Sequence, residues 1–336
     1  MRVRTMLAAA VGAAVIAAGT GVAGAAEAPA AAPRLVHLSV PGTSSDVTVS
    51  AINNAGTVVG AVDGRAVVWN AETGTMRKLR AVPEYPYSVA EAINASGVIV
   101  GLAASSSTAH VSRPVRWNLD GTVTLLTSEE GVAATAIGDD DEIAGWRGGM
   151  FAQRTPVRLR NGKAIDIKVS SGTGYVTDIS GAGVVVGVTQ GYRCNCTPHA
   201  FVTQGASSTT LTLASTVESG AAAITTDGRR IVGTADGRAT VWEHVADTGP
   251  HAGWMMGSLG QPRSGWATQP TGMNGSGDLT VGTAHSGSAQ IGWVRRGTAF
   301  TELDGNRAEP VDVNDGGVIA GYVTATSGAK QPVVWR

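Results

Sequence analysis

A ten-residue pattern, Ala51-Ile-Asn-Asn-Ala-Gly-Thr-Val-Val-Gly60, recurs seven times along the chain and constrains its fold more than any other feature. The second copy begins at Ala92 and the seventh at Asp312. The glycines that close the copies are roughly 40 to 50 residues apart, which is the size of one four-stranded propeller blade. These glycines are Gly60, Gly101, Gly145, Gly187, Gly233, Gly282 and Gly321.

Each copy divides into four strand-like pieces. In the first copy a short piece, 50–53, leads into a turn at 54–56, where Asn and Gly tolerate left-handed backbone angles. The next piece, 57–62, has consecutive apolar residues, which predicts a strand buried on both faces. The third piece ends in a large apolar residue that we expect to pack between blades rather than to bind a ligand. The residues at this position are Trp69, Trp117, Leu159, Phe201, Trp242, Trp293 and Trp335.

The two ends of the repeat region complement each other. The seventh copy stops at Trp335-Arg336, directly after its third piece, and lacks a fourth. The segment 34–41 resembles the fourth piece of the first copy, including its Val-Pro ending. We therefore predict an all-β, seven-bladed β-propeller of four-stranded blades, closed by an N-terminal strand at about 34–40 that completes the last blade. The alternative, an open solenoid, would leave the complementary ends unexplained.

The N-terminal residues have the pattern of a processing signal. Arg2 and Arg4 precede an Ala/Val-rich apolar run that ends in small residues at 23–25. This indicates a secretory signal peptide over 1–25, a linker over 26–33 and a single domain over 34–336. An uncleaved anchor is the alternative, although the run is short for a membrane span. We expect a secreted, extracellular protein with no membrane span after cleavage.

Charge and motif content exclude several functions. The formal net charge of the whole chain is −1, and it becomes −3 when Arg2 and Arg4 leave with the signal peptide. With no basic run, nucleic acid is not an expected partner. The chain has no nucleophile elbow and no phosphate-binding loop. We therefore expect no cofactor and no metal, identify no catalytic residue, and expect a monomer.

Two local clusters have competing interpretations. The acidic run Asp139-Asp-Asp-Glu142 could hold calcium or supply paired carboxylates, but it falls where the first copy has its turn, which favours a solvated hairpin turn. Cys194 and Cys196 favour a local disulfide in an exported protein. With His199 they could instead form a metal or redox site, and unpaired thiols are the third possibility.

Departures from the repeat predict where a binding site would lie. The loops between the second and third pieces are longest in copies two, three, four and seven, and they should emerge on one face together with the connectors between copies. The longest stretch between repeat positions, from Trp242 to Gly282, could overhang the ring. Aromatic and charged side chains on such loops form common recognition surfaces. The predicted ligand-binding rim is Tyr85, Tyr87, His110, Trp146, Arg147, Tyr175, Tyr192 and Trp266.

The whole pattern, Ile/Val-Asn-x-x-Gly-x-Val-Val-Gly followed by Ala-Phe/Val-Trp, resembles the HAF-repeat family of predicted extracellular repeat proteins. His199-Ala-Phe201 preserves the naming tripeptide once, and the other copies match by spacing over 34–336. The resemblance implies a secreted, propeller-like protein and brings no catalytic residues with it.

Three hypotheses for function follow. The first is a non-enzymatic binding or scaffold module whose rim recognises an extracellular or cell-envelope ligand, a saccharide or a protein, with polysaccharide favoured because aromatic rims suit sugar faces. The second is a secreted hydrolase or lyase with its active site, including His110, at the channel mouth. The third is a purely structural repeat protein.

Overall fold

The computed structural model describes residues 33–42, 46–108, 111–148, 153–189, 197–203, 210–213, 216–245 and 253–336. All of them belong to one unit, Ala32–Arg336. These residues form 28 strands and no helix. The predicted signal peptide, 1–25, lies outside the described residues, as does the linker up to residue 32.

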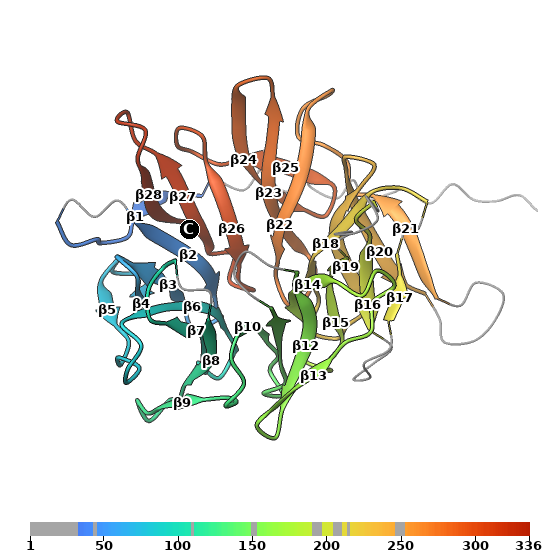
Figure 1. Cartoon of the computed structure of the whole chain (residues 1–336). Helices are drawn as coiled ribbons and strands as arrows, with labels where there is room; N and C mark the ends of the chain where they lie inside the picture. The colour runs from blue at the N-terminus through green and yellow to red at the C-terminus, as the bar shows by residue number, and fades with distance from the viewer. Residues whose placement is uncertain are drawn as a thin grey trace, which may run out of the picture. The chain divides into compact units, whose positions relative to one another are not determined.

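The strands form seven four-stranded antiparallel sheets arranged as blades in a ring, as the sequence predicted (Figure 1). Each blade takes four consecutive strands, with the first nearest the axis, except that the last blade takes its fourth from the N-terminus. Blades one to three contain β2 (Val47–Ile52), β3 (Thr57–Val62), β4 (Arg65–Asn70) and β5 (Met76–Lys78); β6 (Tyr87–Ile93), β7 (Ile99–Ala104), β8 (Ser112–Trp117) and β9 (Val123–Leu125); and β10 (Val132–Ile137), β11 (Ile143–Arg147), β12 (Thr155–Arg160) and β13 (Lys163–Asp166).

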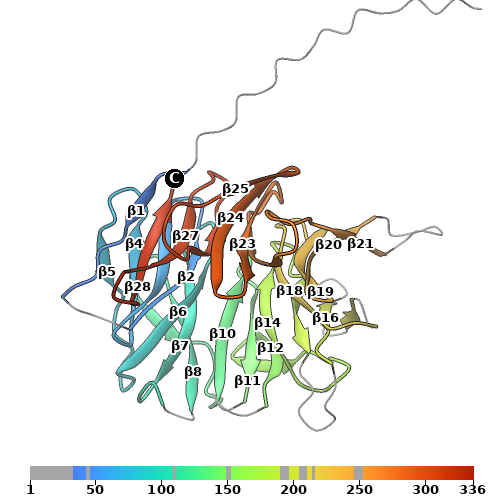
Figure 2. The same cartoon turned by 90° about the horizontal axis from the view of Figure 1, so that it is seen from above.

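The remaining blades repeat this arrangement, and Figure 2 shows the molecule from a direction at right angles to that of Figure 1. Blades four to seven contain β14 (Gly174–Ile179), β15 (Val185–Thr189), β16 (Ala200–Thr203) and β17 (Thr210–Thr212); β18 (Ser219–Ile224), β19 (Arg230–Ala235), β20 (Arg238–His244) and β21 (Trp254–Ser258); β22 (Ala267–Met273), β23 (Leu279–Ser286), β24 (Ala289–Arg296) and β25 (Ala299–Glu302); and β26 (Glu309–Val313), β27 (Ile319–Thr324) and β28 (Lys330–Trp335) with β1 (Leu35–His37).

The ring is closed by pairing between the two ends of the described chain. β1 pairs antiparallel with β28, with Leu35 opposite Trp335 and His37 opposite Val333. Beyond the strands, Arg34 and Arg336 exchange two backbone hydrogen bonds. This pairing supplies the strand that the seventh repeat lacks, and it confirms the predicted closure.

The repeat glycines are explained by a β-bulge on the innermost strand of every blade. In blade one the bulge lies at Ser50, between the paired residues Val49 and Ala51, and Val49 faces Gly60. The bulge brings a main-chain carbonyl so close that a Cβ on Gly60 would lie 1.9 Å from the oxygen of Thr48. The other six repeat glycines would meet an inner-strand carbonyl oxygen at 1.9 to 2.2 Å. Only glycine fits opposite such a bulge.

The core lies between neighbouring blades, where the large residues of the third strands are buried. Trp69, Trp242, Trp293 and Trp335 are each no more than 1% exposed, which confirms the predicted packing role. Three third-strand indoles also fix the preceding connector, because each Nε1 donates to a backbone carbonyl there. The pairs are Trp69 to Ser39, Trp117 to Arg80 and Trp335 to Asp304.

Candidate functional site

A polar channel at the centre of the ring is the candidate site. The bulge on each inner strand turns one side chain toward the axis, and these seven residues, here called the bulge ring, all line a central cavity of about 180 Å³. The bulge ring is Ser50, Glu91, Thr135, Thr177, Ala222, Thr271 and Val311. Four of its members carry hydroxyls and one carries a carboxylate. The same bulge therefore has two effects: it requires a glycine on the second strand, and it turns one side chain of the first strand into the channel.

The channel widens toward one face into a cavity of about 720 Å³. We call this side the connector face, because the chain segments between blades and the loops between second and third strands emerge there. Its lining includes four hydroxyls of the bulge ring, the ring of Tyr175, and Gln269. Glu91 and Glu218 are the charged residues among the described residues that line it, and no Lys, Arg or His is among them.

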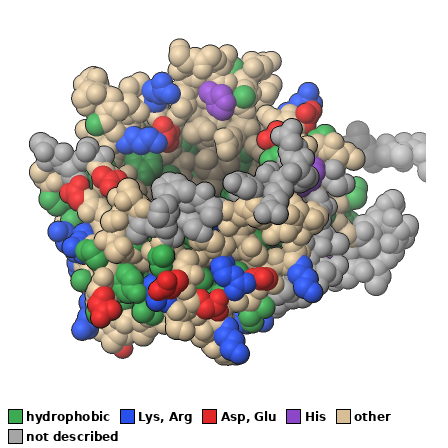
Figure 3. All heavy atoms as spheres, viewed as in Figure 1, with side chains coloured by type: hydrophobic (Ala, Val, Ile, Leu, Met, Phe, Trp, Pro, Cys, Tyr) green, Lys and Arg blue, Asp and Glu red, His purple; other side chains and the backbone are tan. Residues whose placement is uncertain are grey.

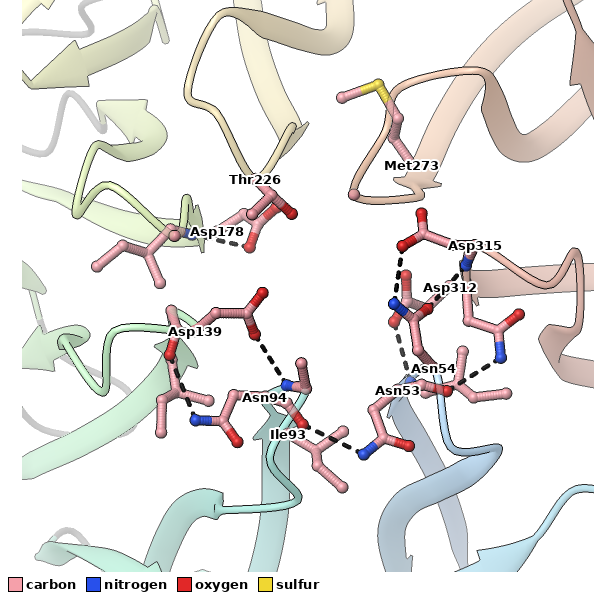
Figure 4. A pocket seen from close by; sticks show the side chains of 18 of the residues that line it. Asn53, Asn54, Ile93, Asn94, Asp139, Asp178, Thr226, Met273, Asp312 and Asp315 are labelled. Carbon is pink, nitrogen blue, oxygen red and sulfur yellow. Dashed lines mark hydrogen bonds between the residues drawn. The ribbon is translucent and has the colours of Figure 1, made fainter.

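The opposite end of the channel opens into a second cavity, of about 470 Å³. It is lined by the turns between first and second strands, one from each blade, and we call this side the turn face (Figure 4). Between the bulge ring and these turns lies a band of seven apolar side chains, one per blade. The band consists of Ile52, Ile93, Ile137, Ile179, Ile224, Met273 and Val313.

Asparagines of the repeat tie the turns of neighbouring blades together. Asn53 accepts a hydrogen bond from the backbone N–H of Thr57 in its own turn and donates its Nδ2 to the carbonyl of Asn94, at 3.2 Å. Asn314 donates in the same way to the carbonyl of Asn53, and Asn94 to that of Gly138. The motif asparagine is therefore a clamp between blades seven, one, two and three.

Two buried aspartates make further links next to the channel. Asp178 accepts hydrogen bonds from the backbone N–H groups of Ile179 and Ile224, and Asp312 accepts from those of Val313 and Ile52. Each carboxylate thus joins its own inner strand to that of the next blade. Burial raises the pKa of Asp178 to about 7 and that of Asp312 to about 6, against the hydrogen bonds that lower it.

Glu91 differs from both aspartates in lacking such partners. Burial raises the pKa of its carboxyl, an effect opposed only by the charge of Arg154. No described group donates a hydrogen bond to the carboxylate, although it borders both the central and the connector-face cavities. The guanidinium of Arg154 lies 4.4 Å from the ring of Trp146 and is not part of the cavity lining.

The structure separates the residues of the predicted rim. Tyr175 on β14 lines the connector-face cavity, and burial raises the pKa of its phenol. Tyr87 and Trp146 pack together in one apolar cluster, and Trp146 is only 4% exposed because it lies within β11 rather than in a loop. Trp266 packs at the interface of blades five and six with the Arg263 guanidinium 4.8 Å from its ring.

The other rim residues are engaged in local contacts or cannot be placed. The hydroxyl of Tyr85 accepts a hydrogen bond from Arg113, and Arg147 forms ion pairs with Glu129 and Asp166. His110, Tyr192, Cys194 and Cys196 lie outside the described residues. Among the predicted rim residues that the structure describes, only Tyr175 lines the channel.

The acidic run at 139–142 forms the expected hairpin turn between β10 and β11. Its side chains diverge: Asp139 accepts from the N–H of Ala95, Asp141 pairs with Arg116, and Glu142 pairs with Arg160. Among the described residues, no group of three or more His, Cys, Asp or Glu side chains could hold a metal ion.

Comparison with known proteins extends the description of the fold but not of the function. No family model matches the chain, so the HAF-repeat resemblance stays a prediction, and no curated protein matches it. Solved structures do match. A puromycin-hydrolyzing peptidase from Mycobacterium tuberculosis is 15% identical with a TM-score of 0.57, over 86% of this chain and 51% of that one.

Two further matches are propeller domains. The Cps50 (Swd1) domain from Myceliophteria thermophila is 13% identical with a TM-score of 0.55, over 89% of this chain and 99% of that one. The propeller domain of the Trilobed protease from Pyrococcus furiosus is 10% identical with a TM-score of 0.51, over 86% and 95%. At these identities the likeness establishes the β-propeller fold alone. In the described part of the chain, no helix is long and apolar enough to cross a membrane.

Proposed function

We propose that this protein is a secreted, non-enzymatic binding module whose ligand occupies the connector-face cavity. The observation that carries the proposal is the lining of that cavity: bulge-ring hydroxyls from four blades and one tyrosine ring surround a space of about 720 Å³. Ligand sites commonly have volumes in the range of roughly 300 to 1,000 Å³. Hydroxyl groups and an aromatic ring suit a hydroxylated ligand, so a saccharide of the cell envelope or surroundings is the proposed partner.

The proposed site lies at the ring axis and not on the outer loops. Tyr175 belongs to both the predicted rim and the cavity, whereas Tyr87 and Trp146 pack in a cluster between blades. A site on inner strands is also more rigid than one on loops, because seven blades hold the lining in register. Secretion is proposed from residues 1–25, and membership of the HAF-repeat family from the repeat pattern.

Titration calorimetry with a panel of envelope polysaccharides and their oligomers tests this function. Tyr175→Ala should weaken binding of any retained saccharide by about 10-fold or more, because an aromatic platform is lost. Trp266→Ala is the matched control, since Trp266 lies on the same face but outside the cavity. If both variants lose affinity for the saccharide equally, or if only Trp266→Ala loses it, the binding site lies on the outer loops instead. No retention of any saccharide would favour a protein ligand or a structural role.

The hydrolase alternative is supported by the buried carboxyls in the channel. A carboxyl whose pKa is raised toward neutrality, as at Asp178, is a property of general acids. However, both oxygens of Asp178 already accept backbone hydrogen bonds. If the wild type releases reducing ends from the same saccharides and Asp178→Asn does not, the hydrolase alternative is favoured.

A further inference from the structure

The bulge ring provides seven equivalent positions that can be compared within one molecule. Six of them are occupied by Ser, Thr, Ala or Val, and these small residues form the same bulge in the same place. A carboxylate is therefore not required to build the strand. Blade two nevertheless places Glu91 there, at a position where burial raises the pKa of the carboxyl.

The environment of Glu91 gives the carboxylate no structural task. Asp178 and Asp312, also beside the channel, are each satisfied by two backbone N–H groups. Glu91 receives none from the described residues, and only the more distant charge of Arg154 favours its ionised form. An anionic group held in a partly desolvated site without donors destabilises a fold. Such a local cost without a structural return is expected at functional positions.

A second polar group beside the same cavity likewise lacks a hydrogen bond from the described residues. The Oγ of Ser50, the bulge-ring residue of the preceding blade, is buried and has no hydrogen-bond partner among the described residues. Thr135, on the following blade, also lines the cavity. The carboxylate is thus flanked by two hydroxyls along one wall.

The charged side chains that line this cavity are both acidic, and the one basic group that acts on Glu91, Arg154, lies outside the lining. Glu218 stands exposed at the connector face of the same cavity, and no basic side chain is among its described lining residues. An anionic ligand group would be repelled here, and a neutral one would leave Glu91 without a partner. A group with several N–H donors and a positive charge satisfies both the carboxylate and the hydroxyls beside it.

We infer that Glu91 is the recognition residue for a primary ammonium group on a hydroxylated ligand, which makes the ligand class an amino sugar. This inference rests on the proposed binding function and specifies the ligand of the same cavity. The ammonium lies at the inner end of the cavity between Glu91 and the bulge-ring hydroxyls, and the sugar ring extends toward Tyr175.

Two saccharides that differ only in this group provide the test. A hexamer of glucosamine and a hexamer of N-acetylglucosamine share length and linkage, but only the first carries ammonium groups. Calorimetry at pH 6 and moderate salt should show the wild type preferring the glucosamine hexamer by about 10-fold or more. Glu91→Gln, which keeps the side-chain shape, should abolish that preference, and Glu218→Gln should reduce it by less than about 3-fold because an exposed charge is screened.

Folding provides an independent readout. Because no described group donates a hydrogen bond to the Glu91 carboxylate, Glu91→Gln should unfold at the same temperature as the wild type or a higher one. A large fall in melting temperature would show that Glu91 has a structural role and would overturn the inference.

The inference and the proposed function fail differently. If both hexamers bind equally and Tyr175→Ala weakens both, the cavity binds saccharides but Glu91 does not read an ammonium group. If neither hexamer binds while a neutral saccharide does, the ligand class is wrong and the binding function stands. If no saccharide binds but a lysine-rich peptide does, and Glu91→Gln abolishes that binding, then Glu91 recognises an ammonium group on a ligand that is not a sugar. That result also overturns the inference.

Discussion

The turn face and the connector face are built from the same seven strands but use their polar groups differently. On the turn face, Asn53, Asn94 and Asn314 bind their own turns and the next blade, so their amides are committed to the ring. On the connector face, the carboxylate of Glu91 and the hydroxyl of Ser50 lack hydrogen bonds from described residues. The polar groups of the turn face hold the ring together, whereas those of the connector face are available to bind a ligand.

This difference teaches that a repeat can separate stability from recognition within one blade, as in blades one and two. Along one inner strand, the bulge residue faces the channel and the asparagine three positions later clamps the next blade. Substitutions at the bulge alter only the lining. The comparison predicts which substitutions should unfold the ring and which should leave it intact.

The largest effect is expected at the repeat glycine. Gly101→Ala would place a Cβ 2.0 Å from the carbonyl oxygen of Val89, a contact that the bulged backbone cannot relieve. We expect a loss in the free energy of unfolding of more than about 4 kcal/mol, measured by urea denaturation. Gly257→Ala, where the nearest atom would be 3.5 Å away, is the control. Similar unfolding midpoints for the two variants would contradict the bulge explanation.

The second effect concerns pH and the aspartates near the turn face. The pKa values of Asp178 and Asp312, about 7 and 6, lie above the ordinary 3.8, so the folded protein holds these protons more tightly than the unfolded chain. Their contribution to stability is therefore fully present below about pH 4 and is lost as pH rises through 6 to 7, by on the order of 3 to 4 kcal/mol for each group.

Denaturation midpoints across pH 4 to 8 measure this effect. The raised pKa of Glu91 acts in the same direction, so the variants must be compared. Asp178→Asn with Asp312→Asn should flatten the profile more than Glu91→Gln does. A profile that keeps its slope in the double variant would show that other groups titrate.

A smaller effect is expected from the asparagine clamp. Asn94→Ala removes the acceptor for the N–H of Val98 and the donor to the carbonyl of Gly138, and both of these groups are buried. We expect a loss of about 2 kcal/mol in the free energy of unfolding. Chemical denaturation measures it, and a loss under about 0.5 kcal/mol would remove the distinction between the two faces.

The smallest effect is expected at the bulge ring. Ser50→Ala deletes a buried hydroxyl that has no partner among the described residues, so stability should change by less than about 0.5 kcal/mol or rise. The melting temperature of this variant, compared with that of Asn94→Ala, tests the separation directly. A destabilisation as large as that of Asn94→Ala would mean that the channel hydroxyls are structural.

The fold could be predicted from the sequence because each of its elements leaves a periodic signal. The spacing of Gly60 and its counterparts gives the blades, and the segment at 34–40 matches the strand that the last repeat lacks. The buried positions of Trp69 and Trp335 follow from the same register. The bulges were not predicted, since they depend on backbone register, which the pattern of side chains does not specify.

The candidate site could be predicted only in part. The positions of loops and connectors predicted Trp146 and Tyr87 as rim residues, but both pack in an apolar cluster. Such positions do not reveal which side chains remain exposed. Tyr175, predicted as a connector residue of the rim, lines the connector-face cavity. Glu91 was missed, although aligning the seven copies places it as the one charged residue at the bulge position, and that departure is the signal that could have found it.

The closure of the ring has a consequence for the order in which the blades can form. Strand β1 pairs with β28, which follows it by about 300 residues in the chain. Without β28, β1 has no strand to pair with, and the ring stays open. Six blades are built from consecutive strands and need only local pairing, whereas the seventh sheet is completed by a contact that closes a loop of nearly the whole ring.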